Sequence, residues 1–309
     1  MRLCAVSVDL DEIHHYYAIH GLKAPAGPAR TLVYDVAIDR LTQLAGDLGI
    51  PLTLFAVGSD LARPESAGKL RSAREHGFEI ANHSLDHRYD FSRLGRAEIR
   101  HQVEEGARAI ERAVGQAPVG FRAPGYTVTD EVFDVLEELG VGYGSSVFPC
   151  PAYYAAKAAA IARIALLGRK SVSILDRPSV LASPTRPYRV GRPYWRRGAG
   201  LIELPVQVTR GLRLPFIGTT VTLWGPAVAS RLARACVGEP LVNLELHGID
   251  VLDASDGLEE LRPHQPDVRV PRGRKIEALG AAIGELQRAG YTFVTLEEAA
   301  QSFASDPPS

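Results

Sequence analysis

Two carboxylates stand two residues apart where a buried strand is expected to end. Leu3 to Val8 is a short apolar run rich in β-branched residues, and it stops at Asp9 and Asp11. If the strand runs extended through them, both side chains project to the same side. One carboxylate could then bind a metal ion while the other accepts a proton, although acidic pairs also commonly begin loops.

Two histidines follow another expected strand. His83 and His87, in the sequence NHSLDH, are four residues apart, so on one helical turn both imidazoles would lie on the same face. Two imidazoles and one carboxylate are the ligands of a hydrolytic metal centre with open positions for water and substrate. Asp11, His83 and His87 are therefore candidate ligands for one divalent cation; Zn²⁺ suits them, and other first-row ions stay open.

Two further strand ends carry candidate catalytic residues. Arg122 begins the sequence RAPGY, in which Pro124 and Gly125 predict a tight turn that exposes backbone N–H groups. Arg122 would lie beside the carboxylates, or it would cap the strand through a salt bridge. His247 ends the apolar run from Leu241 and suits a general acid, although a single histidine at a strand end is usually structural.

The elements that must position these residues alternate between strand and helix. Strands are predicted at 3–8, 52–57, 78–81, 118–122, 201–204, 241–246 and 292–294, and helices near 34–48, 60–76, 96–114, 129–139, 226–237 and 272–289. This alternation predicts parallel strands, whose C-terminal ends carry the active site. We expect an α/β fold, a distorted (β/α) barrel of about seven strands, with an open doubly wound sheet as the competing architecture.

Residues 150–200 interrupt the alternation. This segment is first alanine-rich and apolar, with basic residues such as Lys157, Arg163 and Arg169, and then rich in proline and arginine. We interpret it as an insertion over the barrel mouth, either an ordinary covering helix or a basic amphipathic helix at a membrane surface. The remaining pattern predicts one domain over residues 1–300 and a flexible C-terminal tail over 301–309.

Composition restricts the partners and the compartment. The chain has 309 residues with 35 basic and 36 acidic side chains, so no overall field points to nucleic acid. Its three cysteines are far apart and show no CxxC spacing, which argues against a disulfide framework. The N-terminal apolar run is too short for a signal peptide. We expect a cytoplasmic location, with the inner face of the membrane left open.

In order and spacing, these motifs resemble the polysaccharide deacetylase family, carbohydrate esterase family 4, with its nodulation-type deacetylase homology domain. Members hydrolyse N-acetyl or O-acetyl groups on sugars with one divalent cation. The resemblance covers roughly residues 3–148 and 241–298. The roles that it implies are Asp9 as base, Arg122 as the residue that orients Asp9, Asp11, His83 and His87 as metal ligands, His247 as general acid, and the N–H of Gly125 or Tyr126 as a donor to the scissile carbonyl.

The chain departs from the family pattern at Gly144. In the stretch from Tyr143 to Pro149, an aspartate is usual where Gly144 stands. We expect Asp250 or Glu245 to serve the contacts that this aspartate would make. His14, His15 and His20 also lie near the site in the sequence, and we assign them to loop or substrate-cleft roles.

The resemblance implies a metal-dependent hydrolase of carbon–nitrogen bonds in carbohydrate metabolism. A cytoplasmic enzyme does not reach the finished cell wall, so we expect N-deacetylation of an amino sugar in a biosynthetic pathway. Residues 155–170 and 212–224 could hold a lipid tail, which makes a lipid-linked sugar and a peripheral membrane contact through 155–170 hypotheses. The alternatives are an allantoinase-like hydrolase of small C–N bonds and a non-catalytic sugar-binding relative.

Overall fold

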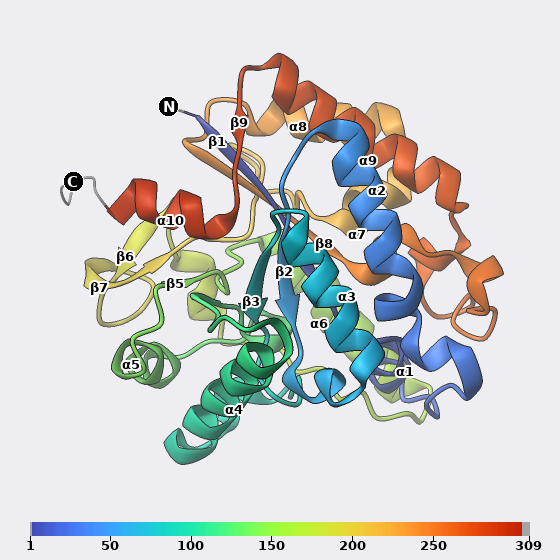
Figure 1. The fold of residues 1–309 in the computed structure, drawn as a ribbon, viewed down its shortest axis with the longest axis horizontal. Coiled ribbons are helices and arrows are strands. Elements are labelled where there is room, and N and C mark those ends of the chain that lie inside the picture. Colours follow the sequence, from blue (N-terminus) through green and yellow to red (C-terminus); the bar gives the residue numbers. More distant parts are fainter. Residues whose placement is uncertain (1, 305–309) are drawn as a thin grey trace.

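One curled β-sheet organises the computed structural model, which describes residues 2–304 (Figure 1). Its strand order is β6-β7-β5-β4-β3-β2-β1-β8, with β9 also paired to β1. The strands are β1 (Leu3–Asp9), β2 (Thr53–Ala56), β3 (Glu79–Asn82), β4 (Gly120–Phe121), β5 (Tyr143–Gly144), β6 (Tyr188–Val190), β7 (Arg197–Glu203), β8 (Leu241–His247) and β9 (Thr292–Phe293). All pairs are parallel except β6 with β7. The predicted α/β class and distorted barrel are confirmed.

Helices surround the sheet and connect its parallel strands (Figure 1). They are α1 (Ile13–Ile19), α2 (Ile38–Leu48), α3 (Pro64–Glu75), α4 (Arg96–Val114), α5 (Asp130–Glu138), α6 (Pro151–Leu166), α7 (Gly218–Trp224), α8 (Pro226–Cys236), α9 (Arg272–Arg288) and α10 (Leu296–Ala304). Several of them begin and end within one or two residues of the predicted helices, because their apolar positions recur at helical spacing.

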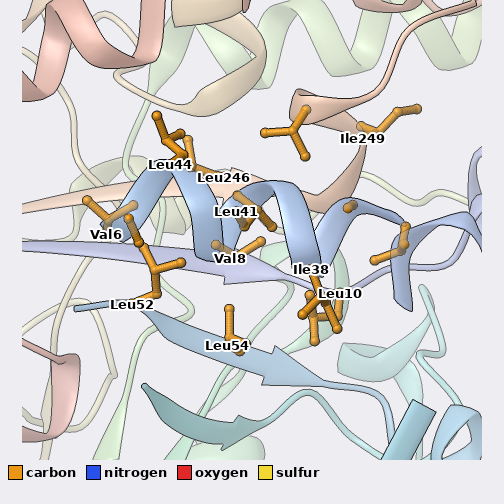
Figure 2. Packing of buried hydrophobic residues seen from close by; sticks show 14 of the residues in the cluster. Val6, Val8, Leu10, Ile38, Leu41, Leu44, Leu52, Leu54, Leu246 and Ile249 are labelled. Atoms are coloured by element: carbon orange, nitrogen blue, oxygen red, sulfur yellow. The ribbon is translucent and has the colours of Figure 1, made fainter. Parts of the chain in front are cut away.

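The core lies between the sheet and the covering helices. Ile38, Leu41 and Leu44 recur every three residues on one face of α2, and they pack against apolar side chains of β1 and β2 such as Val8 and Leu54 (Figure 2). Strand β1 is buried along its whole length, which explains its continuous apolar run. This packing fixes the strand whose C-terminal end carries Asp9.

The barrel is closed loosely between β8 and the segment that follows β7. The N–H of Gln207 donates to the carbonyl of Asn243 in β8 (3.1 Å). The Asn243 side-chain amide donates in turn to the carbonyls of Leu204 (3.1 Å) and Pro205 (3.2 Å). These bonds, in place of a continuous ladder, bring the end of β8 toward the rest of the site.

Three details differ from the predictions. The short strands β5 and β6 were not predicted, so the sheet has nine strands in the described range instead of about seven. The predicted insertion at 150–200 is wrong at its end, because β6 and the first residues of β7 belong to the sheet. Residues 301–304 continue α10, where Phe303 packs against the core, so they are not a tail; residues 305–309 lie outside the described range.

A glycine on α4 lets the loop after β3 approach closely. A Cβ atom on Gly106 would lie 2.6 Å from Oδ1 of Asn82 and 2.8 Å from the carbonyl carbon of Ser84. The Asn82 side chain forms hydrogen bonds to both α4 and the loop. Its amide donates to the Val103 carbonyl of α4 (2.9 Å), and its Oδ1 accepts the Ser84 N–H of the loop (3.0 Å). The loop that carries His83 is therefore seated on the α4 backbone.

Gly106→Ala is expected to destabilise the protein by about 1–3 kcal/mol, because the added methyl group overpacks this contact. The matched control is Gly280→Ala in the interior of α9, where a Cβ atom would meet nothing within 4 Å. That substitution is expected to stabilise the protein by up to about 1 kcal/mol through helix propensity. Denaturant unfolding of both variants measures the difference, and equal stabilities would contradict this account of the contact.

Candidate metal centre and active site

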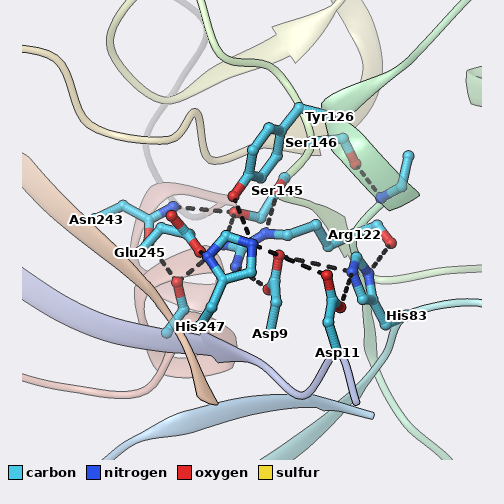
Figure 3. Close-up of polar contacts among 12 residues, drawn as sticks. Asp9, Asp11, His83, Arg122, Tyr126, Ser145, Ser146, Asn243, Glu245 and His247 are labelled. Atoms are coloured by element: carbon cyan, nitrogen blue, oxygen red, sulfur yellow. Dashed lines mark hydrogen bonds and ion pairs between the residues drawn. The ribbon is translucent and has the colours of Figure 1, made fainter. Parts of the chain in front are cut away.

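Strand register brings four of the sequence motifs to one edge of the sheet. Asp9 at the end of β1 is paired with His247 at the end of β8. Asn82 of β3 is paired with Phe121 of β4, so the next residues along each strand, His83 and Arg122, emerge beside each other. The side chains of these four strand ends face a common space (Figure 3).

The structure brings Asp11, His83 and His87 together. Oδ1 of Asp11 lies 3.3 Å from Nε2 of His83 and 3.1 Å from Nε2 of His87. All three residues are buried, and none of these three atoms has a hydrogen-bond partner among residues 2–304. Buried polar atoms are normally paired. Three that face one another unpaired fit a bound cation.

The charges of these groups agree with that fit. Burial raises the pKa of the Asp11 carboxyl, but His87 and His83 more than offset this effect and hold the pKa well below its usual range. Burial lowers the pKa of His83, yet the carboxylates of Asp9 and Asp11 raise it above its usual value. The site therefore attracts a positive charge.

A backbone carbonyl sets the tautomer of His83. Nδ1 of His83 lies 2.7 Å from the carbonyl oxygen of Arg122, which can only accept a hydrogen bond. The N–H of the neutral ring is therefore at Nδ1, and Nε2 keeps its lone pair toward Asp11.

A tight loop, and not a helical turn, presents the two histidines. Ser84 (φ 68°) and His87 (φ 49°) are in the left-handed region, which residues other than glycine seldom adopt. Hydrogen bonds hold the loop: the N–H groups of Gly58 and Ser59 donate to the carbonyls of Ser84 (2.9 Å) and Leu85 (2.8 Å). The predicted convergence of His83 and His87 is observed, but its helical reason was wrong.

Arg122 is fully buried and holds one oxygen of Asp9. Its Nη1 donates to Oδ1 of Asp9 (2.6 Å), and its Nη2 donates to the hydroxyls of Ser7 (2.9 Å) and Ser145 (2.8 Å). Its Nε donates to the Ser145 carbonyl (2.7 Å). The other oxygen of Asp9, Oδ2, lies 3.6 Å from Nε2 of His83. Asp9 is thus tied on one side and open toward the candidate metal centre on the other.

His247 is paired with a carboxylate from its own strand. Glu245 precedes it by two residues, so both side chains leave β8 on the same side. Nδ1 of His247 lies 2.9 Å from Oε1 of Glu245, and Nε2 lies 3.5 Å from the Tyr126 hydroxyl. Burial lowers the pKa of His247, but Glu245, and then Asp11 and Asp9, raise it well above its usual value. The geometry supplies a protonated imidazole whose Nε2 faces the site.

Asp250 acts on the backbone and not on the imidazole. Its Oδ2 accepts the N–H of His247 (2.8 Å), which caps the 3₁₀ turn Gly248–Val251. Burial raises the pKa of Asp250 to about 7. Of the two residues expected to compensate for Gly144, only Glu245 contacts the His247 ring.

The space beside Gly144 is occupied by the side chain of Glu203, which was not among the predicted site residues. A Cβ atom on Gly144 would lie 2.3 Å from Oε2 of Glu203, which is its partner in the β5–β7 pairing. Oε1 of Glu203 accepts the N–H groups of Ser146 (2.6 Å) and Val147 (2.7 Å). Glu203 therefore fills the position from a neighbouring strand. Its only sequence signal was a carboxylate within the predicted strand 201–204.

The turn at Gly125 offers one free backbone donor. The N–H of Tyr126 donates to the Ala123 carbonyl (3.1 Å), so it is not available to a substrate. Gly125 (φ 61°) has no such bond within residues 2–304, and its carbonyl accepts the Lys157 ammonium (3.0 Å). Of the two N–H groups implied by the family resemblance, only that of Gly125 fits the role.

The site opens into a cavity of about 940 Å³ with largely apolar walls. Asp9, Asp11 and His247 lie at one part of it, and the residues of α6, α7 and α8 that line it include Ala156, Ala160, Ile164, Trp224, Val228 and Leu232. The large exposed hydrophobic residues of the described chain are Leu166, Leu167, Val172, Leu212, Leu214 and Trp224. Leu167, Leu214 and Trp224 line this cavity, and the other three are within five residues of them in the sequence.

Comparisons with known proteins find a matching family model and several structures with a similar fold. Residues 33–144 match the family model described as polysaccharide deacetylase. A search of curated proteins finds no match. Structures with a similar fold include a candidate polysaccharide deacetylase from Mycobacterium smegmatis, with 19% identity and a TM-score of 0.59 over 100% of this chain and 93% of that chain.

Two other solved structures represent different activities within the same fold. A family 4 acetyl xylan esterase from Clostridium thermocellum, in complex with a cobalt ion, has 16% identity and a TM-score of 0.50 over 99% of this chain and 93% of that chain. Wild-type BA3943, a CE4 family pseudoenzyme from Bacillus anthracis, has 13% identity and a TM-score of 0.52 over 97% of this chain and 65% of that chain. At these identities the likeness establishes the fold alone. Residues 33–144 are therefore similar to the polysaccharide deacetylase family, and the fold is shared with carbohydrate esterase family 4 structures.

Proposed function

We propose that the protein is a metal-dependent deacetylase that hydrolyses the N-acetyl or N-acyl amide of an amino sugar. One observation carries this proposal: the three unpaired, buried atoms of Asp11, His83 and His87 converge beside a carboxylate held by Arg122. Asp11, His83 and His87 would hold the cation, and Zn²⁺ suits them. When bound, such a cation lowers the pKa of water toward neutrality and polarises the scissile carbonyl.

The residues around the cation divide the proton transfers. Asp9, oriented through Oδ1 by Arg122, accepts the proton of the attacking water at its free Oδ2. The protonated His247 donates from Nε2 to the leaving amine nitrogen, while Glu245 stabilises the ring at Nδ1. The N–H of Gly125 donates to the developing oxyanion. The guanidinium of Arg122 also supplies a counter-charge to the Asp9 carboxylate in a buried setting.

Two alternatives were an allantoinase-like hydrolase of small C–N bonds and a non-catalytic sugar-binding relative, and a feature of the site argues against each. A small cyclic amide would need a small closed pocket, whereas this cavity measures about 940 Å³. The second alternative, a non-catalytic sugar-binding relative, has a precedent in the pseudoenzyme from Bacillus anthracis, which shares the fold. This chain, however, combines a carboxylate base and an imidazole acid with candidate metal ligands, so we favour an active enzyme.

We further propose that the substrate is lipid-linked and belongs to a biosynthetic pathway. Segments 155–170 and 212–224 both line the cavity, and their apolar side chains would cover a lipid chain. A cluster of exposed apolar residues on a water-soluble surface commonly marks an interaction site. The location in the cytoplasm stays a prediction.

The exposed apolar residues near the cavity would also allow a peripheral contact with a membrane. No helix of the described chain combines the length and apolarity needed to cross a bilayer. Leu166 (88% exposed) and Leu212 (79% exposed) are suited to rest in the interface of one. The fraction of protein that co-sediments with liposomes should be lower for Leu166→Ser/Leu212→Ser than for the unsubstituted protein. If the unsubstituted protein does not bind liposomes, or if the double variant binds them equally well, the contact is contradicted.

Loss of the base or the acid is expected to slow turnover strongly without loss of metal. Asp9→Asn and His247→Ala should each slow zinc-dependent acetate release from an N-acetylglucosamine oligomer by about 10²–10⁴-fold. Both should retain one zinc ion by elemental analysis, whereas His83→Ala should lose it. The control is Asp47→Asn, an exposed carboxylate on α2. Undiminished acetate release by Asp9→Asn would contradict the proposal, and faster hydrolysis of allantoin than of the sugar would favour the alternative.

Removing the charge of Glu245 is expected to move the alkaline limit of activity. His247 acts in its protonated form, so kcat/KM falls as the pH rises through the pKa of this residue. Glu245 raises that pKa, so in Glu245→Gln the fall should begin at a lower pH, while activity below the pKa of His247 changes little. Glu245→Asp retains the charge and is the control. An alkaline limit that stays in place in Glu245→Gln would show that Glu245 does not tune His247.

A further inference from the structure

Four basic side chains from three segments lie near one another in the lining of the cavity. They are His20 at the end of α1, Arg163 on α6, Arg169 on the loop after α6, and His264 on the loop before α9; all four line the cavity, and we refer to them as the cation cluster. Nη1 of Arg169 lies 3.5 Å from the His264 ring nitrogens, and the rings of His20 and His264 are 5.7 Å apart between centroids.

The cation cluster has no carboxylate to balance it. Among residues 2–304, no side chain of the cluster forms an ion pair, and Arg163 has no hydrogen-bonded side-chain partner. Nε2 of His20 forms a hydrogen bond to the neutral amide of Gln265 (3.0 Å). Burial, and then the charges of Arg169, His20 and Arg163, lower the pKa of His264, so a positive charge on this ring is disfavoured beside the other basic groups. An anion would offset these charges.

The protein backbone holds the cluster in place. A Cβ atom on Gly21 (φ 63°) would lie 2.9 Å from the carbonyl oxygen of Lys170 and 3.0 Å from Cβ of Arg169. The N–H of Val172 donates to the Ala18 carbonyl (3.4 Å). The loop after α6 therefore packs directly on the end of α1. This contact sets Arg169 beside Gly21, the residue that follows His20.

The cluster shares its cavity with both the candidate active site and the apolar walls. We propose that the cation cluster binds the phosphate group of an amphiphilic substrate whose apolar chain lies against α6 and the Trp224 region. Arginine guanidinium groups match phosphate oxygens in geometry as well as in charge. The inference rests on the proposed function, because it assigns a substrate class to the same cavity: an acylated amino sugar joined through phosphate to a lipid chain.

Trp224 offers a direct reporter of binding. It lines the cavity, and the chain has only 2 tryptophans, so Trp195→Phe leaves Trp224 as the single fluorophore. In this background, dodecyl phosphate below its micelle concentration should change the emission saturably. Arg163→Gln/Arg169→Gln should raise its Kd by about 10- to 100-fold, the range for lost hydrogen bonds to a charged group. Arg93→Gln/Arg112→Gln, two exposed arginines outside the cavity, is the matched control and should bind as the parent does.

Dodecanol and inorganic phosphate separate the two parts of the ligand. Dodecanol should bind more weakly than dodecyl phosphate and should not distinguish the double variant from its parent. Equal affinity of dodecyl phosphate for both proteins would overturn the proposal, and so would competition by inorganic phosphate at the same concentration as dodecyl phosphate.

The binding assay is independent of catalysis. It needs neither metal nor turnover, and it should give the same Kd in Asp9→Asn. If dodecyl phosphate binds through the arginines but acetate release is absent under all conditions, the deacetylase proposal fails while the phosphate site stands. If acetate release is found and dodecyl phosphate does not bind, only the substrate class fails.

Discussion

The buried side chain of Arg122 is the contact on which the rest of the site depends. Its guanidinium holds Oδ1 of Asp9 at 2.6 Å, and its carbonyl accepts the Nδ1–H of His83 at 2.7 Å. One residue thereby orients the proposed base and sets the tautomer of a proposed metal ligand. It also separates the two carboxylates in function, because Asp9 is paired with the Arg122 guanidinium, while Asp11 lies against the imidazoles of His83 and His87. Without Arg122, Asp9 would be a buried, unpaired charge, which commonly costs several kcal/mol.

The parts of this arrangement that local pattern controls could be predicted from the sequence. The helical spacing of apolar residues predicted α4 over residues 96–114, and the apolar runs predicted β1 and β8 with their polar ends. In a parallel sheet, such ends meet at one edge. Asp9 and His247 could therefore be expected together, although 238 residues separate them, and the pairing of β1 with β8 brings them into register.

The parts that depend on contacts between distant segments could not be predicted. The carboxylate at Gly144 comes from Glu203 on another strand, and β5 is too short, at two residues, to show a periodicity. His83 and His87 converge through a loop whose left-handed residues depend on bonds from Gly58 and Ser59. The cation cluster likewise unites segments near residues 20, 163–169 and 264, and spacing alone does not reveal such a convergence.

The location of the metal ion tests the central claim most directly. Anomalous X-ray diffraction at the zinc edge, on crystals grown with Zn²⁺, is predicted to show one ion bound by Asp11 and by Nε2 of His83 and His87, at about 2.0–2.2 Å from each ligand atom. A second group of potential ligands, Asp9, Glu245 and His247, lies close by. An ion bound to that group, or no ion at saturating Zn²⁺, would contradict the assignment of Asp9 as base and His247 as acid.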